Sequence, residues 1–204
     1  MSFSSGEKIL DKIRKNAEEV KQTMVYKLRN RLATIADEEE ACKNPYWAYM
    51  FAWEVKGAYI EKCQEAACQD PKWAYCFARY VKGVNIKKCQ EAACKDPAWA
   101  FDFALNIKRA NIERCCEGAC KEPGWAYLFA LDVKGANIEK CQEAACKNPM
   151  SAYKFAMDVK GANIEKCEDA ACQDPYCAFL FAQNIKRANK EKCREVCKGS
   201  KYEF

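Results

Sequence analysis

The chain has 204 residues, of which 50% are hydrophobic and 31% are charged. This balance is ordinary for a folded protein and excludes a disordered chain. The net charge of +5 is too small to indicate a nucleic-acid-binding protein. Two features are unusual: there are 16 cysteines and no histidine. The absence of histidine excludes Ser-His and Cys-His catalytic pairs and every histidine-ligated metal site.

The N-terminal residues carry no targeting signal that we recognise. Residues 1–10 contain no apolar run and no small-residue cleavage site, so we expect no signal peptide. No stretch approaches the roughly 18 consecutive apolar residues of a membrane span. We therefore predict a cytoplasmic protein without membrane contact. In such a reducing compartment, regularly spaced cysteines favour metal or redox chemistry over disulfides.

Residues 1–41 have a pattern of their own. Apolar residues recur at spacings of three and four, which predicts an amphipathic helix. We expect this helix to cap the apolar face of the first repeat, and the alternative is a coiled-coil arm for self-association. The acidic run at 37–40 is interpreted as a solvated helix end. The apolar positions are Leu10, Ile13, Ala17, Val20, Met24, Leu28 and Leu32.

From Cys42 onward the sequence repeats with a period of 26 residues, the spacing between Cys42 and Cys68. Self-similarity of this kind indicates a solenoid built from stacked units. We predict an all-α fold: an α-solenoid of six helix-pair repeats over 42–197, followed by a tail at 198–204. The repeats begin at Cys42, Cys68, Cys94, Cys120, Cys146 and Cys172.

Each repeat contains start and stop signals for two short helices. An Asn or Asp directly before proline, as in Asn44-Pro45, predicts an N-cap followed by proline at the first helical position. Glu122 is a weaker cap at the same place. We expect the first helix to run from Pro45 to about Lys56 and to end at Gly57. The second helix is expected to start after a capping asparagine, namely Asn85, Asn111, Asn137, Asn163 or Asn189.

The first helices carry an aromatic stripe. Tryptophan and phenylalanine recur four residues apart, which places them on one helix face and predicts burial between repeats. A stacking platform for nucleic acid would need these rings exposed beside a basic groove, and we do not expect one. Cys177 replaces a tryptophan of the stripe, so we interpret Cys177 and Cys76 as core residues.

Thirteen cysteines follow the repeat, and Cys76, Cys116 and Cys177 do not. One column lies on the second helix and comprises Cys63, Cys89, Cys115, Cys141, Cys167 and Cys193. The other column lies five residues later and comprises Cys68, Cys94, Cys120, Cys146 and Cys172, with Cys42 before the first repeat and Cys197 closing the last pair.

These columns have three interpretations. The cysteines could be small buried hydrophobic residues. They could form disulfides between residues five apart, if the chain turned after the helix. They could also form four-thiolate metal sites, each from two neighbouring repeats, grouped as Cys63/Cys68/Cys89/Cys94, Cys115/Cys120/Cys141/Cys146 and Cys167/Cys172/Cys193/Cys197. A frame shifted by one cysteine gives Cys42/Cys63/Cys68/Cys89, Cys94/Cys115/Cys120/Cys141 and Cys146/Cys167/Cys172/Cys193. We prefer the first grouping because it uses complete pairs and includes Cys197.

The surroundings of the cysteines suit thiolates. A lysine or arginine precedes every cysteine of the second-helix column, as Lys62 precedes Cys63, and adjacent positive charge lowers the pKa of a thiol. All-thiolate sites bind zinc, Cu(I) or iron–sulfur clusters. A solenoid with its own aromatic core does not need zinc to fold. A row of four-cysteine sites fits about three [4Fe–4S] clusters.

The unit K-G-x-N…D/N-P-x-W-A-Y-x-F-A resembles the 26-residue helical repeats of many bacterial and phage proteins, over residues 42–197. That resemblance implies an α-solenoid and no particular activity. With its two cysteine columns, the chain is similar to an iron–sulfur α-solenoid that carries a row of [4Fe–4S] clusters.

The sequence therefore predicts an iron–sulfur electron-transfer protein with an unidentified redox partner protein and no catalysis of its own. We expect no nucleic-acid partner. The alternatives are a helical-repeat interaction scaffold with buried or disulfide-bonded cysteines, and a Cu(I)- or zinc-thiolate protein.

Overall fold

The computed structural model describes residue 19 and residues 23–204, and over these residues all regular structure is helical, with no strand. The all-α prediction is confirmed. Helix pairs follow one another along the chain, as in an α-solenoid. The described residues divide into two compact units, one that ends at Asn85 and one that begins at Ile86.

The first unit consists of short N-terminal helices followed by helices of the first two repeats. Helix α2 contacts α4 and buries Met24 and Leu28, whereas Leu32 is 55% exposed. The remaining apolar positions of the expected N-terminal helix, Leu10, Ile13, Ala17 and Val20, lie outside the described residues. The helices are α2 (Met24–Arg29), η1 (Ile35–Asp37), α3 (Glu38–Ala41), α4 (Pro45–Glu54), α5 (Ile60–Ala67) and α6 (Pro71–Tyr80).

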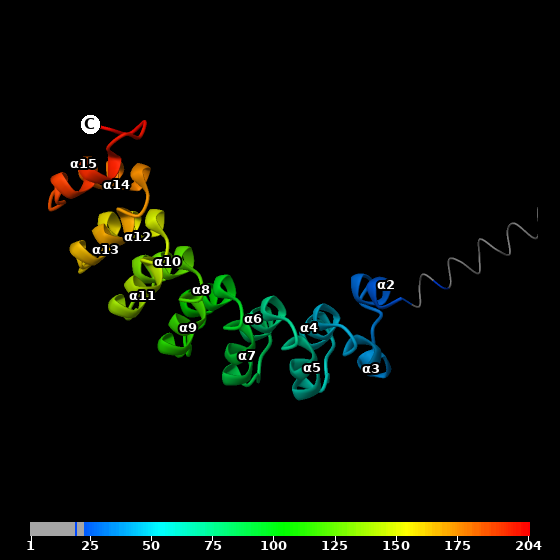
Figure 1. Ribbon diagram of the computed structural model, residues 1–204. Coiled ribbons are helices and arrows are strands. Elements are labelled where there is room, and N and C mark those ends of the chain that lie inside the picture. The colour runs from blue at the N-terminus through cyan, green and yellow to red at the C-terminus, as the bar shows by residue number, and fades with distance from the viewer. Residues whose placement is uncertain (1–18, 20–22) are drawn as a thin grey trace, which may run out of the picture. The chain divides into compact units, whose positions relative to one another are not determined.

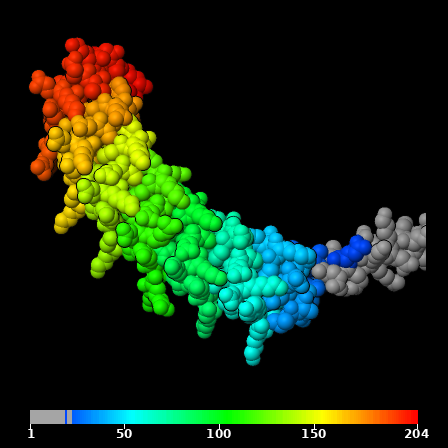
Figure 2. All heavy atoms as spheres, turned by 60° about the horizontal axis from the view of Figure 1, so that its bottom comes forward, coloured from blue at the N-terminus to red at the C-terminus, as the bar shows by residue number. Residues whose placement is uncertain are grey.

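The unit that begins at Ile86 contains α7, which is the second helix of its repeat, and four complete helix pairs. In Figure 1 the first helices of its pairs form one row and the second helices another. Successive first helices contact one another, and α9, α11 and α13 each contact the first helix of their own repeat and that of the next. Figure 2 shows the repeats of this unit as consecutive bands packed side by side. The helices are α7 (Ile86–Ala93), α8 (Pro97–Asn106), α9 (Ile112–Ala119), α10 (Pro123–Asp132), α11 (Ile138–Ala145), α12 (Pro149–Asp158), α13 (Ile164–Ala171), α14 (Pro175–Asn184) and α15 (Lys190–Cys197).

The first helices begin as the sequence predicts. The side chain of Asp96 accepts hydrogen bonds from the backbone N–H groups of Ala98 and Trp99, and Pro97 occupies the first helical position. Glu122 makes no side-chain capping bond, which confirms the expected weaker cap. The first helix ends at Glu54 rather than Lys56, because Val55 is extended. Gly57 follows with a φ of 89°, which glycine adopts without strain.

The aromatic stripe forms the core, as expected, although its two columns differ. The phenylalanines are fully buried, whereas the tryptophans are half-buried, and two of them lie against rings of the preceding repeat. Trp73 lies 4.6 Å from Tyr46, and Trp125 lies 5.7 Å from Phe101, between ring centroids. Cys177 is buried, as predicted, and Cys76 is half-buried. The fully buried phenylalanines are Phe51, Phe77, Phe103, Phe129, Phe155 and Phe181.

In three second helices, a buried glutamine binds the backbone of the asparagine that lies 21 residues later, directly before the second helix of the next repeat. Its side-chain NH₂ donates to the backbone carbonyl of the capping asparagine, and its side-chain oxygen accepts from the N–H of the same asparagine. For Gln142 and Asn163 these distances are 2.7 and 2.9 Å. The glutamine thereby satisfies both backbone groups of a residue that precedes a helix. The three pairs are Gln64–Asn85, Gln90–Asn111 and Gln142–Asn163.

Glutamate takes the place of this glutamine at two positions. Glu168 accepts from the Asn189 N–H at 2.5 Å, and Glu38 accepts from the Tyr59 N–H at 2.6 Å. Glu38 is thus not simply part of a solvated helix end, as the acidic run predicted. Because Glu38 lies 26 residues before Gln64, α3 holds the position of a second helix from a preceding repeat.

The C-terminal residues pack on α14, the first helix of the sixth repeat. The ring of Tyr202 lies 5.0 Å from that of Tyr176, and the ring of Phe204 lies 5.6 Å from that of Phe179. Both contacted residues belong to α14. The tail therefore covers part of the aromatic surface of α14.

Candidate functional site

The two cysteine columns have different surroundings. Cysteines of the second-helix column are buried, and Cys63, for example, has no exposed surface. Cysteines of the other column stand directly after the second helix. There Cys68, Cys120, Cys146 and Cys172 are C-cap residues, half-buried at the helix end. These four helix ends therefore each present a partly accessible thiol, whereas Cys94 of the same column is buried.

The contacts join the columns across repeats. In each contact, the cysteine after one second helix lies against the buried cysteine 21 residues later, in the next second helix. The sulfur–sulfur distances are 3.7 to 4.0 Å, which is contact distance between thiols. We call these contacts the inter-repeat thiol pairs. They are Cys42–Cys63, Cys94–Cys115, Cys120–Cys141, Cys146–Cys167 and Cys172–Cys193.

These contacts can be compared with the two groupings of four cysteines that the sequence suggested. The first grouping places Cys63 and Cys94 in one set, yet Cys63 contacts Cys42 and Cys94 contacts Cys115. The shifted frame keeps each inter-repeat thiol pair within one set. Cys68 and Cys89 stand at the same repeat positions as these pairs. The contacts therefore agree with the shifted frame better than with the first grouping.

Cys197 occupies a different position within its repeat from the cysteines that follow the other second helices. It lies 130 residues after Ala67, which is five periods of 26, and so it replaces a buried alanine of the second helix. Its side chain is fully buried, and its sulfur donates to the Pro175 carbonyl at 3.2 Å. Cys197 therefore packs as a core residue here, and Lys198 holds the position that cysteine holds in the other repeats.

The basic residues beside the second-helix column do not activate its thiols, contrary to the sequence-based expectation. Burial raises the pKa of Cys63, and the nearby Lys62 opposes this only weakly. The pKa of Cys115 is raised by its hydrogen bond with Cys94 and by burial. Within this pair the pKa of Cys94 is lowered, chiefly by its hydrogen bond with Cys115. Contact with a second thiol and loss of solvent therefore outweigh the adjacent charge.

One junction gathers a third thiol. In α9, Cys116 occupies the position that glutamine holds in α5, α7 and α11. Its sulfur lies 3.6 Å from Cys120 and 3.4 Å from Cys141, whose own sulfurs are 3.9 Å apart. Among the described residues, this is the one group of three ligand-type side chains with atoms within 4.8 Å of one another. We call Cys116, Cys120 and Cys141 the thiol triad.

Cys116 also inherits part of the role of the glutamine. At other junctions the equivalent asparagine N–H donates to a glutamine oxygen, and here the Asn137 N–H helps to lower the pKa of the Cys116 thiol. Hydrogen bonds from Cys120 and Cys141, together with this N–H, hold the pKa of the Cys116 thiol far below its usual range. The sequence analysis treated Cys116 as outside the pattern. The usable signal was the interruption of the glutamine column by cysteine.

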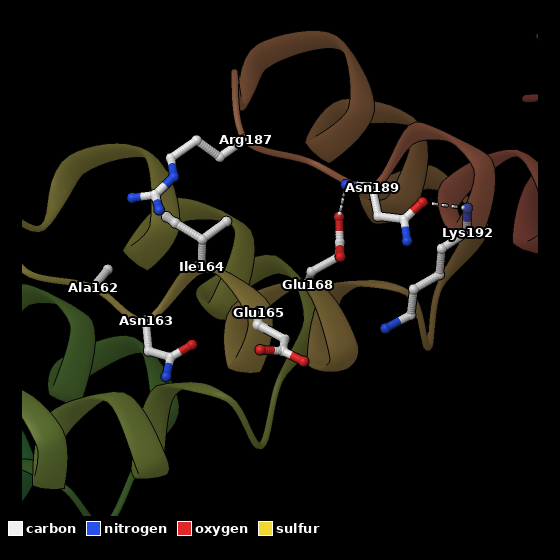
Figure 3. Close-up of a pocket in the computed structure, with 8 residues that line it drawn as sticks. All are labelled: Ala162, Asn163, Ile164, Glu165, Glu168, Arg187, Asn189 and Lys192. Atoms are coloured by element: carbon white, nitrogen blue, oxygen red, sulfur yellow. Dashed lines mark hydrogen bonds between the residues drawn. The ribbon is translucent and has the colours of Figure 1, made fainter.

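A polar pocket of about 510 Å³ lies between the second helices α13 and α15 (Figure 3). Arg187 and Lys192 provide positive charge, and Glu165 and Glu168 provide negative charge. Glu168 is engaged with the Asn189 N–H, and Lys192 pairs with Asp169. The charges are mixed and partly satisfied within the protein, so the pocket shows no preference for a ligand of one sign.

Comparison of the chain with family models, with curated proteins and with solved structures found no match. Within the part of the chain that the structure describes, no helix combines the length and apolar character needed to cross a bilayer.

Proposed function

We propose that the protein is a helical-repeat interaction scaffold whose repeats are held together by disulfides formed from the inter-repeat thiol pairs. The observation that supports this proposal is the constant register of those pairs. Each joins residues 21 apart in consecutive second helices, with sulfurs 3.7 to 4.0 Å apart. Each contact brings together two thiols, which is the number that one disulfide joins.

The geometry requires little movement to form the bonds. A disulfide has a sulfur–sulfur distance of about 2.05 Å, so each sulfur would move by about 1 Å, which side-chain rotation can supply. Each bond formed removes two protons and two electrons, which an oxidant such as oxidised glutathione accepts. Closing a loop of this length would stabilise the folded chain by about 3 kcal/mol per bond.

The surface of the second unit supports a binding role. A large apolar side chain near the end of the first helix is solvent-exposed in three successive repeats: Leu105 is 46%, Leu131 is 41% and Met157 is 49% exposed. These residues are 26 apart, so each repeat presents the same kind of contact at the same place. Trp53 holds the equivalent position in the first unit and is 54% exposed. Repetition of one contact along a solenoid fits an extended partner with apolar side chains.

The iron–sulfur electron-transfer hypothesis stays a prediction. A [4Fe–4S] cluster needs four thiolate ligands, and the shifted frame would supply them from two consecutive pairs. The raised pKa of the buried thiols works against this, because Cys63 and Cys115 would both have to lose their protons. The disulfide proposal in turn requires an oxidising environment, which departs from the cytoplasmic location expected from the N-terminal sequence.

The test is to map the cysteines of the full-length protein. After equilibration with oxidised glutathione and blocking of the remaining thiols, peptide mass spectrometry should find cross-links between residues 21 apart, such as Cys146 with Cys167. Links between residues five apart, or full retention of titratable thiols, would overturn the proposal.

A parallel sample purified without oxygen should be assayed for iron and sulfide. Under the scaffold proposal it contains neither. A brown sample with about four iron and four sulfide per four-cysteine set would instead establish the cluster hypothesis.

A further inference from the structure

We propose that the thiol triad, Cys116, Cys120 and Cys141, binds a single thiophilic d¹⁰ metal ion, Zn²⁺ or Cu(I), between α9 and α11. Cys120 and Cys141 also form one of the inter-repeat thiol pairs, so the ion binds the reduced triad and takes the place of a disulfide at this junction. It gives a role to Cys116, one of the three cysteines that do not follow the repeat.

The distances match those of a metal-bound set of thiolates. Zinc–sulfur bonds are about 2.3 Å long, so three sulfurs around one tetrahedral ion lie about 3.8 Å from one another. The triad has sulfur–sulfur distances of 3.4, 3.6 and 3.9 Å. An ion could therefore bond to all three sulfurs after shifts of a fraction of an ångström. A trigonal Cu(I) site needs similar separations.

The backbone fixes these positions. Cys116 lies in α9 and Cys120 is the C-cap of the same helix, so the two thiols are one helical turn apart. Cys141 lies in α11 and has no exposed surface. Two rigid helices therefore hold the ligands, and a loop does not have to order for the ion to bind.

Access and charge also suit an ion. Cys116 and Cys141 are fully buried, while Cys120 is half-buried and gives the ion a route from solvent. The three thiols contribute three ligands, which leaves the fourth position of a zinc ion to water. With all three sulfurs bound as thiolates, Zn²⁺ leaves the site with one net negative charge. Lys140, which attracts negative charge on Cys116 and Cys120, would offset it.

The neighbouring junction lacks only the third thiol. Between α11 and α13 the pair Cys146–Cys167 has a sulfur–sulfur distance of 4.0 Å, close to that of Cys120–Cys141. The side chain that corresponds to Cys116 is Gln142, whose NH₂ group lies 3.1 Å from the Cys167 sulfur. A cysteine at 142 would therefore stand where Cys116 stands.

The experiment titrates the reduced full-length protein with Zn²⁺ in competition with a chromogenic chelator, and separately with Cu(I) in competition with bicinchoninate. Wild-type protein should take a single tight equivalent of the ion that the site prefers. Cys116→Gln should take none, since it restores the glutamine of the other junctions and removes the third ligand. Gln142→Cys should take two equivalents, because it builds a second triad.

Cys177→Ala provides the matched control, since it removes a buried thiol that lies outside the triad. It should retain the single equivalent, and circular dichroism should show unchanged helix content in all variants. Equal binding by wild-type protein and Cys116→Gln, or no tight binding of either ion by wild-type protein, would overturn the proposal. The scaffold proposal fails on a different result, the absence of cross-links after oxidation, so the two failures are distinguishable.

Discussion

The α9–α11 and α11–α13 junctions of the second unit share one architecture and differ in their chemistry. Both place a C-cap cysteine against a buried cysteine 21 residues later, and both begin the next second helix with a capping asparagine. At the α11–α13 junction Gln142 binds the backbone of Asn163. At the α9–α11 junction Cys116 adds a third sulfur to the thiol pair.

One buried position in the second helix therefore sets the chemistry of a junction. A glutamine there completes the hydrogen bonds of the next helix start, which stabilises the stack. A cysteine there gives up one of those bonds, since sulfur is a weak acceptor, and gains a ligand for soft metals. A second position differs as well, because Gly118 of α9 corresponds to Ala144 of α11.

The largest effect is expected from the Cys146–Cys167 thiol pair at the α11–α13 junction. The double substitution Cys146→Ala/Cys167→Ala removes one disulfide, so the oxidised protein should lose about 3 kcal/mol of its free energy of unfolding. The measurement is denaturant unfolding of oxidised and reduced samples. Reduced wild-type and variant proteins should differ much less, because only the side-chain packing changes. A loss of equal size in both states would contradict the prediction.

The glutamine itself should give the next largest effect. Gln142→Ala leaves the backbone N–H and carbonyl of Asn163 without their partner, and we expect a loss of about 2 kcal/mol. The reverse change, Cys116→Gln, should raise the unfolding free energy of the reduced, metal-free protein by about 1 kcal/mol. Urea unfolding of both variants measures this. A stabilised Gln142→Ala would show that the two hydrogen bonds contribute nothing to the stack.

Replacement of Gly118 in α9 should lower the free energy of unfolding. A Cβ at Gly118 would lie 2.7 Å from the Ala100 Cβ and 2.8 Å from the Cys94 carbonyl oxygen, so Gly118→Ala should cost about 1–2 kcal/mol despite the better helix propensity of alanine. Ala144→Gly should cost about 1 kcal/mol, since it loosens the helix without relieving a contact. Thermal unfolding of both variants tests this, and a stabilised Gly118→Ala would show that α9 can move away from Cys94 and Ala100 at little cost.

The capping asparagines should behave alike at the two junctions. Asn137 and Asn163 each accept the backbone N–H three residues on, at 3.0 and 3.1 Å. Asn137→Ala and Asn163→Ala should therefore each cost about 1 kcal/mol. Parallel urea unfolding curves provide the comparison. A clearly larger loss at Asn163 would mean that its cap and its bonds to Gln142 act together.

Much of the local structure could be read from the sequence because each signal acts within a few residues. Asn44 and Asp96 before proline mark helix starts, and both cap as predicted. The phenylalanine column reveals the buried face because residues one turn apart share a side of the helix. Cys116 could not be interpreted in this way, since its partners include Cys141 on another helix, 25 residues away.

The 26-residue period by itself determined the helix pairs, their caps and the all-α class, because these depend on hydrogen bonds and side-chain burial within one repeat. It also showed that the cysteines form two columns. Only the tertiary structure decided which thiols meet. Cys63 and Cys68 are close in sequence, yet Cys63 contacts Cys42, because stacking places the end of one second helix against the middle of the next. Contacts between repeats depend on how the helices pack, and a spacing of five residues carries no information about that packing.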